Sequence, residues 1–367
     1  MIKFNPSNIK TKFRFSKELI ELKKYSIHRS SWRLFWTRFL NKKSNWFLLI
    51  LLIAFMLFII FSAIFYRYPS NQAVLDSELA INLPNYNNAY ISQTFDPESP
   101  ELKFILEQNK INHPFDIVQS VQQVGDSFII KYNPYKLIEF LTGQKYVLIF
   151  GTNYNKIDRF SFFIASFGFT ILITIIAAVF QILFGAVLGS VIGYYSKKSF
   201  SKLSFYLFNI LNALPFLIIC IILFNFTNYT ALNAIWIFSI FGSVSFFYTS
   251  YSNASILKDK EFIISYKTSG MSDLWIIFNI IFVENMWLCL SLISENISLN
   301  ILALSSLAFF NVKGVSGALN LGSVFLDLIN DLSNIEYLIF VVIFVSLFVV
   351  LSKMLSISLY QAYIVQS

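Results

Sequence analysis

The chain has 367 residues, of which 56% are hydrophobic and 13% are charged, and its mean hydropathy is +0.63. A water-soluble domain cannot leave so much apolar surface in water, and the apolar runs reach the roughly 20 residues that cross a bilayer, so the composition excludes a soluble globular protein and indicates an all-α polytopic membrane protein. The formal charge of +8 does not indicate nucleic-acid binding, because much of it lies in the N-terminal tail and near membrane edges, where it sets topology.

The N-terminal tail, residues 1–45, is strongly basic and is expected in the cytoplasm. Aromatic and basic residues alternate at roughly helical spacing in residues 31–40, which predicts an interfacial helix on the inner leaflet. The first crossing is expected at residues 46–66. The basic tail and the apolar run that follows it are both too long for a simple cleaved signal peptide.

Residues 67–158 are polar, rich in proline and acidic overall, so we expect them outside the cell. Residues 127–132 and 145–150 have the composition of strands, and residues 102–109 are expected to be helical. The segment is either a small folded α+β domain or an irregular ordered loop packed on the membrane part.

The second crossing, residues 160–195, is longer than a perpendicular span needs, so it tilts or extends beyond the bilayer. It carries three glycines on one helix face, a pattern that lets another helix approach closely: Gly185, Gly189 and Gly193. The third crossing is expected at residues 203–226. Pro215 near its middle removes a backbone hydrogen bond and predicts a kink, either beside a pathway or as plain packing.

The fourth crossing, residues 231–251, is followed by the polar stretch 261–285. This stretch predicts a short amphipathic helix with an apolar face: Phe262, Ile263 and Tyr266. Three charged residues can face water: Lys260, Glu261 and Lys267. Gly270 can take the left-handed conformation that ends a helix, and Ser272 with Asp273 suits the start of the next one. The alternative interpretation is an ordinary loop.

The fifth crossing, residues 286–310, contains Glu295. A carboxylate at membrane depth is costly, so it should face the bundle interior or a water-filled cavity. It is either a pathway or contact residue, or part of a satisfied interhelical hydrogen bond. With an external segment at 311–335 and a last crossing at 336–360, six crossings place both termini in the cytoplasm.

No motif for chemistry is evident in the sequence. There is no G-x-x-x-x-G-K-[ST] loop for a nucleotide. His28 and His113 fall on opposite sides of the membrane, and Cys220 and Cys289 lie in apolar runs, so neither a metal site nor a disulfide framework is expected. One buried carboxylate and no clear internal repeat disfavour a secondary transporter. We therefore expect no catalytic, cofactor or metal site, and a pathway driven from outside this chain.

Several groups of residues occur in an order that resembles a known family. In the polar stretch they are Glu261, Phe262, Ile263, Lys267, Gly270, Met271, Ser272 and Asn285. Elsewhere they are Trp32, Arg33, Arg38, Phe39, Asn41 and Lys42; Gly151, Thr152, Asn153, Asp158 and Ser161; the glycine stripe with Tyr194; Pro215; and Leu302, Ala303, Ser305, Leu307, Phe309 and Gly322. Together they resemble the permeases of ATP-binding-cassette (ABC) importers, closest to the oligopeptide/dipeptide permease C-type subunit.

The chain also departs from that family's pattern. Ile264, Ser265 and Tyr266 replace its usual loop residues, and Glu284 stands in place of a proline. Further departures are Lys156, Ile157, Leu304 and Asn311.

The resemblance implies six transmembrane helices of the MetI-like type and a coupling helix around residues 261–270 that docks on a cytoplasmic ATPase. The coupling residues it implies are Glu261, Phe262, Ile263, Ser265, Tyr266, Lys267, Gly270, Met271 and Ser272. Residues implied in helix packing or the pathway are Gly185, Gly189, Gly193, Pro215 and Glu295. Implied partners are a homologous second permease, two ATPase subunits that bind ATP and Mg, an external substrate-binding lipoprotein and membrane lipid, but no nucleic acid.

The expected organisation is a tail (1–45), a first helix (46–66), an external segment (67–158), a permease domain (159–360) with the coupling loop 252–285, and a cytoplasmic end (361–367). The protein is expected in the plasma membrane as an oligopeptide importer subunit and not as an enzyme. Dipeptides, nickel or another small solute remain alternatives as cargo. A membrane scaffold or assembly protein is the alternative from a different class.

Overall fold

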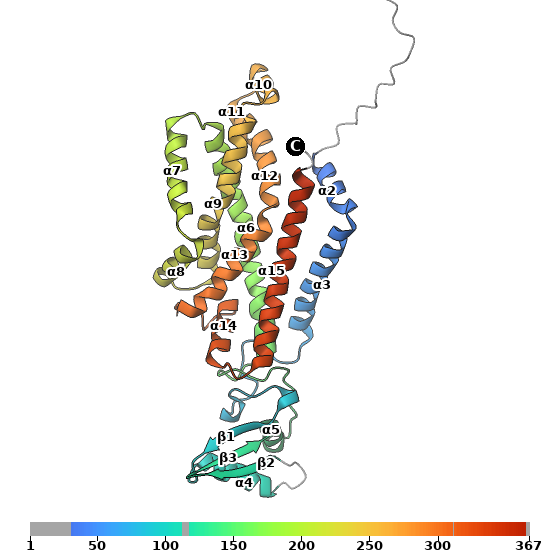
Figure 1. Cartoon of the computed structure of the whole chain (residues 1–367), viewed down its shortest axis with the longest axis vertical. Helices are drawn as coiled ribbons and strands as arrows, with labels where there is room; N and C mark the ends of the chain where they lie inside the picture. Colours follow the sequence, from blue (N-terminus) through green and yellow to red (C-terminus); the bar gives the residue numbers. More distant parts are fainter. Residues whose placement is uncertain (1–30, 112–116, 311, 365–367) are drawn as a thin grey trace, which may run out of the picture.

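The computed structural model describes residues 31–111, 117–310 and 312–364. His28 and His113 lie outside these residues. Within the described part, the fold is mostly helical, with six helices long and apolar enough to cross a membrane and a small strand-containing unit between the first and second of them. The predicted fold class is confirmed (Figure 1).

The chain enters the bundle through two consecutive helices, α2 (Ser31–Asn41) and α3 (Lys43–Phe65). They are separated by Lys42, whose backbone is extended. Helix α3 leaves most of its apolar side chains exposed, as expected of a helix surrounded by lipid. Its inner face packs on the last helix, where the rings of Phe55 and Phe344 lie 4.4 Å apart.

The strand-containing unit between α3 and α6 is a folded body with a core of its own. Its elements are η1 (Glu78–Ala80), η2 (Tyr86–Asn88), β1 (Ile91–Phe95), α4 (Pro100–Ile111), β2 (Val118–Val124), β3 (Ser127–Tyr132) and α5 (Pro134–Thr142). The strands form an antiparallel sheet in the order β1-β3-β2. Fully buried Ile130 of β3 packs with Leu102 and Ile105 of α4, so the sheet and helix share one apolar core.

Residues 145–150, which we expected to form a strand, have no strand structure. Leu148 is fully buried, which accounts for the apolar pattern. The backbone here makes isolated hydrogen bonds instead of the repeated bonds of a paired strand. The Leu148 carbonyl accepts from Tyr86 N at 3.1 Å, and Val147 N donates to Tyr68 Oη at 3.0 Å. A strand needs a paired neighbour, and no described strand lies beside this segment.

The centre of the bundle is a pair of parallel helices, α6 (Arg159–Tyr194) and α9 (Ala231–Leu257). A Cβ on Gly185 would meet Phe246, and one on Gly193 would meet Tyr251. Residue numbers at the contacts therefore increase in the same direction along both helices, which makes the pair parallel. Parallel helices require the chain between them to cross back. That return is made by α7 (Ser199–Ala213) and α8 (Phe216–Thr227).

The third crossing differs from the prediction of one kinked helix. Helices α7 and α8 meet at 85°, so the crossing is broken in two. Leu214 and Pro215 both have extended backbone, with ψ of 129° and 125°. Proline disfavours helical geometry in the residue before it, which ends α7 outright.

The fifth crossing begins earlier than residues 286–310. It runs through α11 (Asp273–Ile276), the π-helical turn η3 (Ile277–Ile281), α12 (Phe282–Leu290), α13 (Ile293–Ser306) and η4 (Leu307–Phe310). The segments 273–290 and 293–310 are each long enough to cross alone. They nevertheless run one after the other along α9 and antiparallel to it. Asn253 donates to Asn285 at 2.8 Å, and Ser245, earlier in α9, donates to Asn296, later in the crossing, at 3.1 Å. We therefore treat them as one crossing in two parts.

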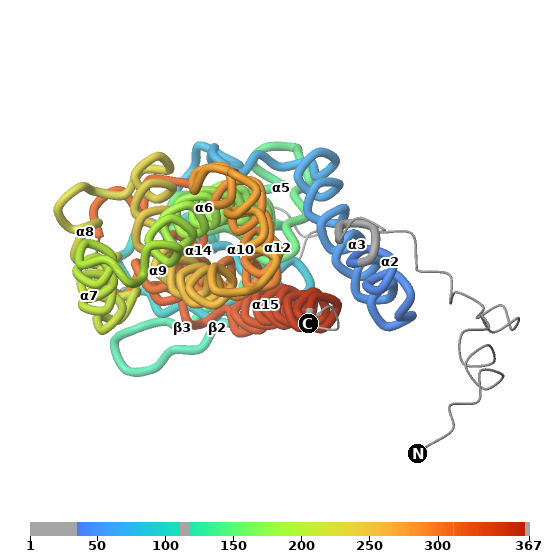
Figure 2. Tube along the Cα trace, turned by 90° about the horizontal axis from the view of Figure 1, so that it is seen from above, coloured from blue at the N-terminus to red at the C-terminus, as the bar shows by residue number. Residues whose placement is uncertain are grey.

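The chain ends with α14 (Leu321–Asn330) and the long helix α15 (Ile335–Ile364). Helix α14 folds back under the bundle, where Leu321 N donates to Thr170 Oγ1 at 2.9 Å. Figure 1 places α2, α10 and the end of α15 at one end of the bundle and the sheet at the other. From above, α7 and α8 form one flank and α2 and α3 the other (Figure 2).

Candidate functional site

The short helix α10 (Glu261–Thr268) follows α9 directly, as the polar stretch predicted. Its anchor is Ile263, which is 1% exposed and packs with Ile276 and Ile277. Phe262 and Tyr266, expected on the same apolar face, are instead 45% and 40% exposed. Of the expected face, only Ile263 is buried in this chain, and it alone belongs to the buried cluster at the helix end.

The turn after α10 has the predicted geometry. Gly270 has φ of +83°, in the left-handed region, and Met271 N donates to the Tyr266 carbonyl at 3.1 Å. The Ser272 hydroxyl then accepts from Trp275 N at 3.3 Å and caps α11. This turn directs α11 back into the bundle.

Exposed apolar side chains on α10 and α11 form what we call the apical patch, defined as Phe262, Ile264, Tyr266, Met271, Leu274 and Trp275. Each is between 39% and 62% exposed. The rings of Tyr266 and Trp275 lie 5.9 Å apart and join the two helices. The other expected coupling residues, Glu261, Ser265, Lys267, Gly270 and Ser272, are exposed around it. A patch of this kind at the aqueous end of a bundle is typical of a protein–protein contact.

The apical patch is fastened to the end of α6 through Asp273. The hydroxyl of Tyr194 donates to Asp273 Oδ1 at 2.7 Å, and Tyr195 Oη lies 3.5 Å from Oδ2. Lys267 of α10 pairs with the same carboxylate at 3.3 Å. Asp273 therefore connects α10 and α11 to the end of α6.

The glycine stripe lies in the α6–α9 interface, as its spacing predicted. A Cβ on Gly189 would sit 2.5 Å from Ser250 Cβ and 2.7 Å from the Phe247 carbonyl oxygen. Buried amides join the next helix to this pair: Gln181 donates to Asn300 at 3.2 Å. The interface has no room for larger side chains at these three positions, so the two helices pack in close backbone contact.

Glu295 lies in a hollow of about 480 Å³ between α9, α12–α13 and α15. Its side chain is 52% exposed, and Lys353 Nζ lies 3.9 Å from its carboxylate. The residues with polar side-chain groups that line the hollow are Thr249, Ser252, Asn253, Ser291, Glu295, Ser356 and Tyr360. Pro215 lines a second hollow, of about 220 Å³, with Ser245 and Asn296. The surface of the Glu295 hollow is more apolar than polar, so its polar residues are grouped around the carboxylate within a mainly apolar lining.

Comparison with known families identifies the chain. Residues 181–364 match the family described as binding-protein-dependent transport system inner membrane component. The chain belongs to this family of permeases. Residues 30–87 match the N-terminal transmembrane domain of oligopeptide transport permease C, so it is an ABC-transporter permease of that type. Members are membrane subunits and not catalytic enzymes. A comparison with curated proteins gives no significant match.

At the opposite end of the permease, the structure reveals an ion-pair cluster that we did not predict. Arg159, with a side chain only 2% exposed, lies 3.5 Å from Asp327 Oδ2 of α14 and pairs with Asp331. Burial raises the pKa of Asp327 to about 6. Burial would also raise the pKa of Asp331. Hydrogen bonds from Ser333 and Arg159 outweigh this effect, so the pKa of Asp331 is lowered. The unusual arginine at the start of an apolar run was the available signal.

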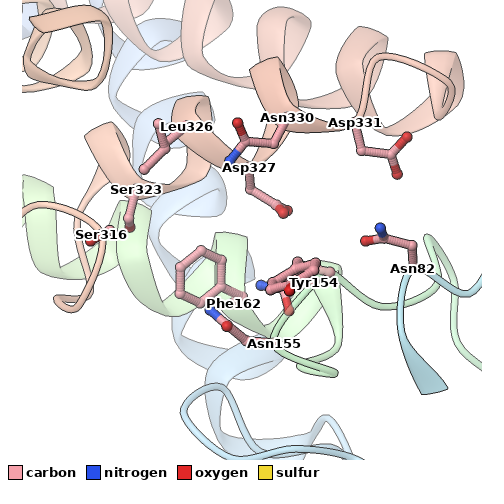
Figure 3. A pocket seen from close by; sticks show the side chains of 11 residues that line it. Asn82, Tyr154, Asn155, Phe162, Ser316, Ser323, Leu326, Asp327, Asn330 and Asp331 are labelled. Atoms are coloured by element: carbon pink, nitrogen blue, oxygen red, sulfur yellow. The ribbon is translucent and has the colours of Figure 1, made fainter. Parts of the chain in front are cut away.

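A pocket of about 350 Å³ adjoins this cluster. In Figure 3, Asp327 and Asn330 of α14 lie on one side of it, and Tyr154 and Phe162 lie on the other. Asn82 from the strand-containing unit reaches its edge. The pocket therefore joins three parts of the permease that are far apart in sequence.

Proposed function

We propose that this permease subunit forms the pathway for oligopeptides in an ABC importer, together with a homologous second permease. In this proposal α10 is the coupling helix, which docks in a groove of one of two cytoplasmic ATPase subunits. The observation that carries it is the apical patch, which exposes six large apolar side chains at one aqueous end. Aromatic residues are enriched in the core of protein–protein contacts, and this patch contains three of them.

The proposed mechanism uses the connection between α10 and the bundle. ATP-driven closure of the ATPases moves α10, and Asp273 passes the movement to Tyr194 of α6 and to α11. The crossing that starts at α11 continues past Glu295, so the docking site and the hollow around Glu295 share one element. Coupling of this kind requires an element with two arrangements that both sites bias. ATP and Mg bind to the partners and not to this chain.

The proposed topology places α10 and both termini in the cytoplasm of a plasma-membrane protein. The basic residues near the ends of the crossings support this orientation by the positive-inside rule. The strand-containing unit then faces outside, where an external substrate-binding lipoprotein would deliver the peptide. The N-terminal match to oligopeptide permease C supports peptides as cargo.

The test is peptide uptake in a strain that lacks the gene and carries it back in wild-type or altered form. A double variant, Tyr266→Ser with Trp275→Ser, removes the two contacting rings of the patch. We expect it to insert normally, to retain less ATPase on purification and to lose peptide uptake. The control is Val147→Ser, which changes a 45% exposed apolar residue on the strand-containing unit. Unchanged ATPase retention and uptake in the double variant would refute the coupling role.

A further inference from the structure

Four of the residues that line the hollow around Glu295 keep oxygens that can accept a hydrogen bond, and Ser252 and Tyr360 add two hydroxyl groups. The hydroxyl protons of three lining residues are used on backbone carbonyls: Thr249 donates to Ser245 at 3.1 Å, Ser291 to Leu288 at 2.6 Å, and Ser356 to Ser291. A hydroxyl oxygen that donates its proton keeps lone pairs that can accept. The amide nitrogen of Asn253 donates one N–H to Asn285 at 2.8 Å, which leaves the Asn253 carbonyl oxygen and one further N–H.

The Glu295 carboxylate has hydrogen-bond acceptor sites that no described residue occupies. Its one contact among the described residues is Lys353, at 3.9 Å with both side chains more than half exposed. An exposed ion pair at that distance contributes little, so exchange of Lys353 for another ammonium group costs little. A carboxylate offers about four lone-pair sites, and most remain free to meet a ligand.

The other two carboxylates of this crossing lie nearer its start and are already engaged. Glu284 accepts from Tyr363 Oη at 3.2 Å, and Asp273 is held by Tyr194 and Lys267. Glu295 is the one carboxylate among the described residues that line the hollow. Hydroxyl and amide oxygens around one carboxylate suit a group that carries several N–H donors and a positive charge.

We propose that Glu295 binds the protonated terminal amine of the transported peptide, in exchange for Lys353, and so determines specificity for peptides with a free amino end. This inference rests on the proposed function, since it names the chemical group that the pathway recognises. The neighbouring oxygens of Thr249, Ser291 and Ser356 accept from the remaining ammonium and amide N–H groups.

The test uses the assembled transporter in nanodiscs without its external binding protein, so that the selectivity of that protein does not enter. The probes are radiolabelled tri-alanine and its N-acetyl form, and the affinity of each is measured by scintillation proximity. Glu295→Gln should weaken binding of the free-amine peptide about tenfold, because one charge-assisted contact is lost, and should leave the N-acetyl peptide unchanged. Lys353→Gln should strengthen binding of the free-amine peptide.

The matched control is Glu107→Gln, the same change on the exposed surface of α4. Equal weakening of both peptides by Glu295→Gln, or no weakening of either, would overturn the inference. So would a wild-type complex that binds neither peptide while cells still import tri-alanine, and the proposed function would then stand. Cells that import neither peptide through this transporter would overturn the proposed function and this inference with it.

Discussion

Tyr194, in the last turn of α6, donates a 2.7 Å hydrogen bond to Asp273, the first residue of α11. The contact joins helix α6, which packs closely on α9, to the loop that carries the apical patch. A hydrogen bond to a charged group contributes about 1.5–3 kcal/mol. Tyr195 and Lys267 lie 3.5 and 3.3 Å from the same carboxylate. Loss of the Tyr194 hydrogen bond alone would therefore leave two weaker contacts to Asp273.

We predict that Tyr194→Phe lowers peptide uptake about three- to tenfold, because the ring stays in place while the hydrogen bond is lost. The amount of inserted protein should not change. Tyr206→Phe, on the exposed side of α7, is the matched control and should transport normally. The measurement is uptake per inserted permease in membranes quantified by immunoblot. A full wild-type rate for Tyr194→Phe would show that this contact does not carry the coupling.

Gly270 provides a second test, based on backbone conformation alone. Its φ is +83°, and an added Cβ would meet no atom within 4 Å. The cost of a β-branched residue is therefore conformational, about 1–2 kcal/mol, whereas Asn enters the left-handed region more readily. We predict that Gly270→Val reduces uptake and ATPase retention and that Gly270→Asn largely preserves both. Equal behaviour of the two variants would contradict this reason.

The glycine stripe predicts a loss of stability and not of coupling. A Cβ at Gly189 would sit 2.5 Å from Ser250 Cβ, so Gly189→Ala should destabilise the bundle by about 1–3 kcal/mol. Gly317→Ala is the control, since nothing lies within 4 Å of its Cβ position. Thermal unfolding in detergent can be followed with a thiol-reactive dye, because Cys220 and Cys289 are free and buried. The melting temperature should fall for the first variant alone.

Local sequence patterns were sufficient to predict much of the fold. Apolar runs located the crossings, and the spacing of Gly185, Gly189 and Gly193 predicted the face that packs on another helix. Gly270 and Ser272 predicted the turn and cap, because each requirement is met within a few residues. These features depend on backbone conformation and periodicity, which a short stretch of sequence contains.

Features that depend on distant partners could not be read in the same way. Leu148 made residues 145–150 resemble a strand, but strand formation needs a neighbour that this segment lacks. Pro215 predicted a kink but not the 85° break between two helices, which depends on how α8 packs on α9. The cost of an isolated charge indicated that Glu295 avoids lipid, whereas its neighbour Lys353 comes from another helix.

Asp158 gives the last prediction, a dependence of stability on pH. This residue caps α6 by accepting from Ser161 N at 2.7 Å, and it is fully buried. Burial raises its pKa from 3.8 to about 6, although the Ser161 hydrogen bonds act in the opposite direction. Between about pH 4 and pH 6 the folded state therefore binds more protons than the unfolded state. The free energy of unfolding falls as pH rises through that window.

Asp158→Asn keeps an oxygen that can cap α6 and removes the charge. We predict that it matches the wild type near pH 4 and is more stable at pH 7, by up to about 3 kcal/mol, since one pKa unit corresponds to about 1.4 kcal/mol. Circular dichroism melts in detergent at pH 4, 5, 6 and 7 measure the difference. Some slope should remain in the variant, because the pKa of Asp327 is also raised to about 6. Asp96→Asn, at an exposed position, is the control. A variant that keeps the full wild-type slope would show that Asp158 is not the group that titrates.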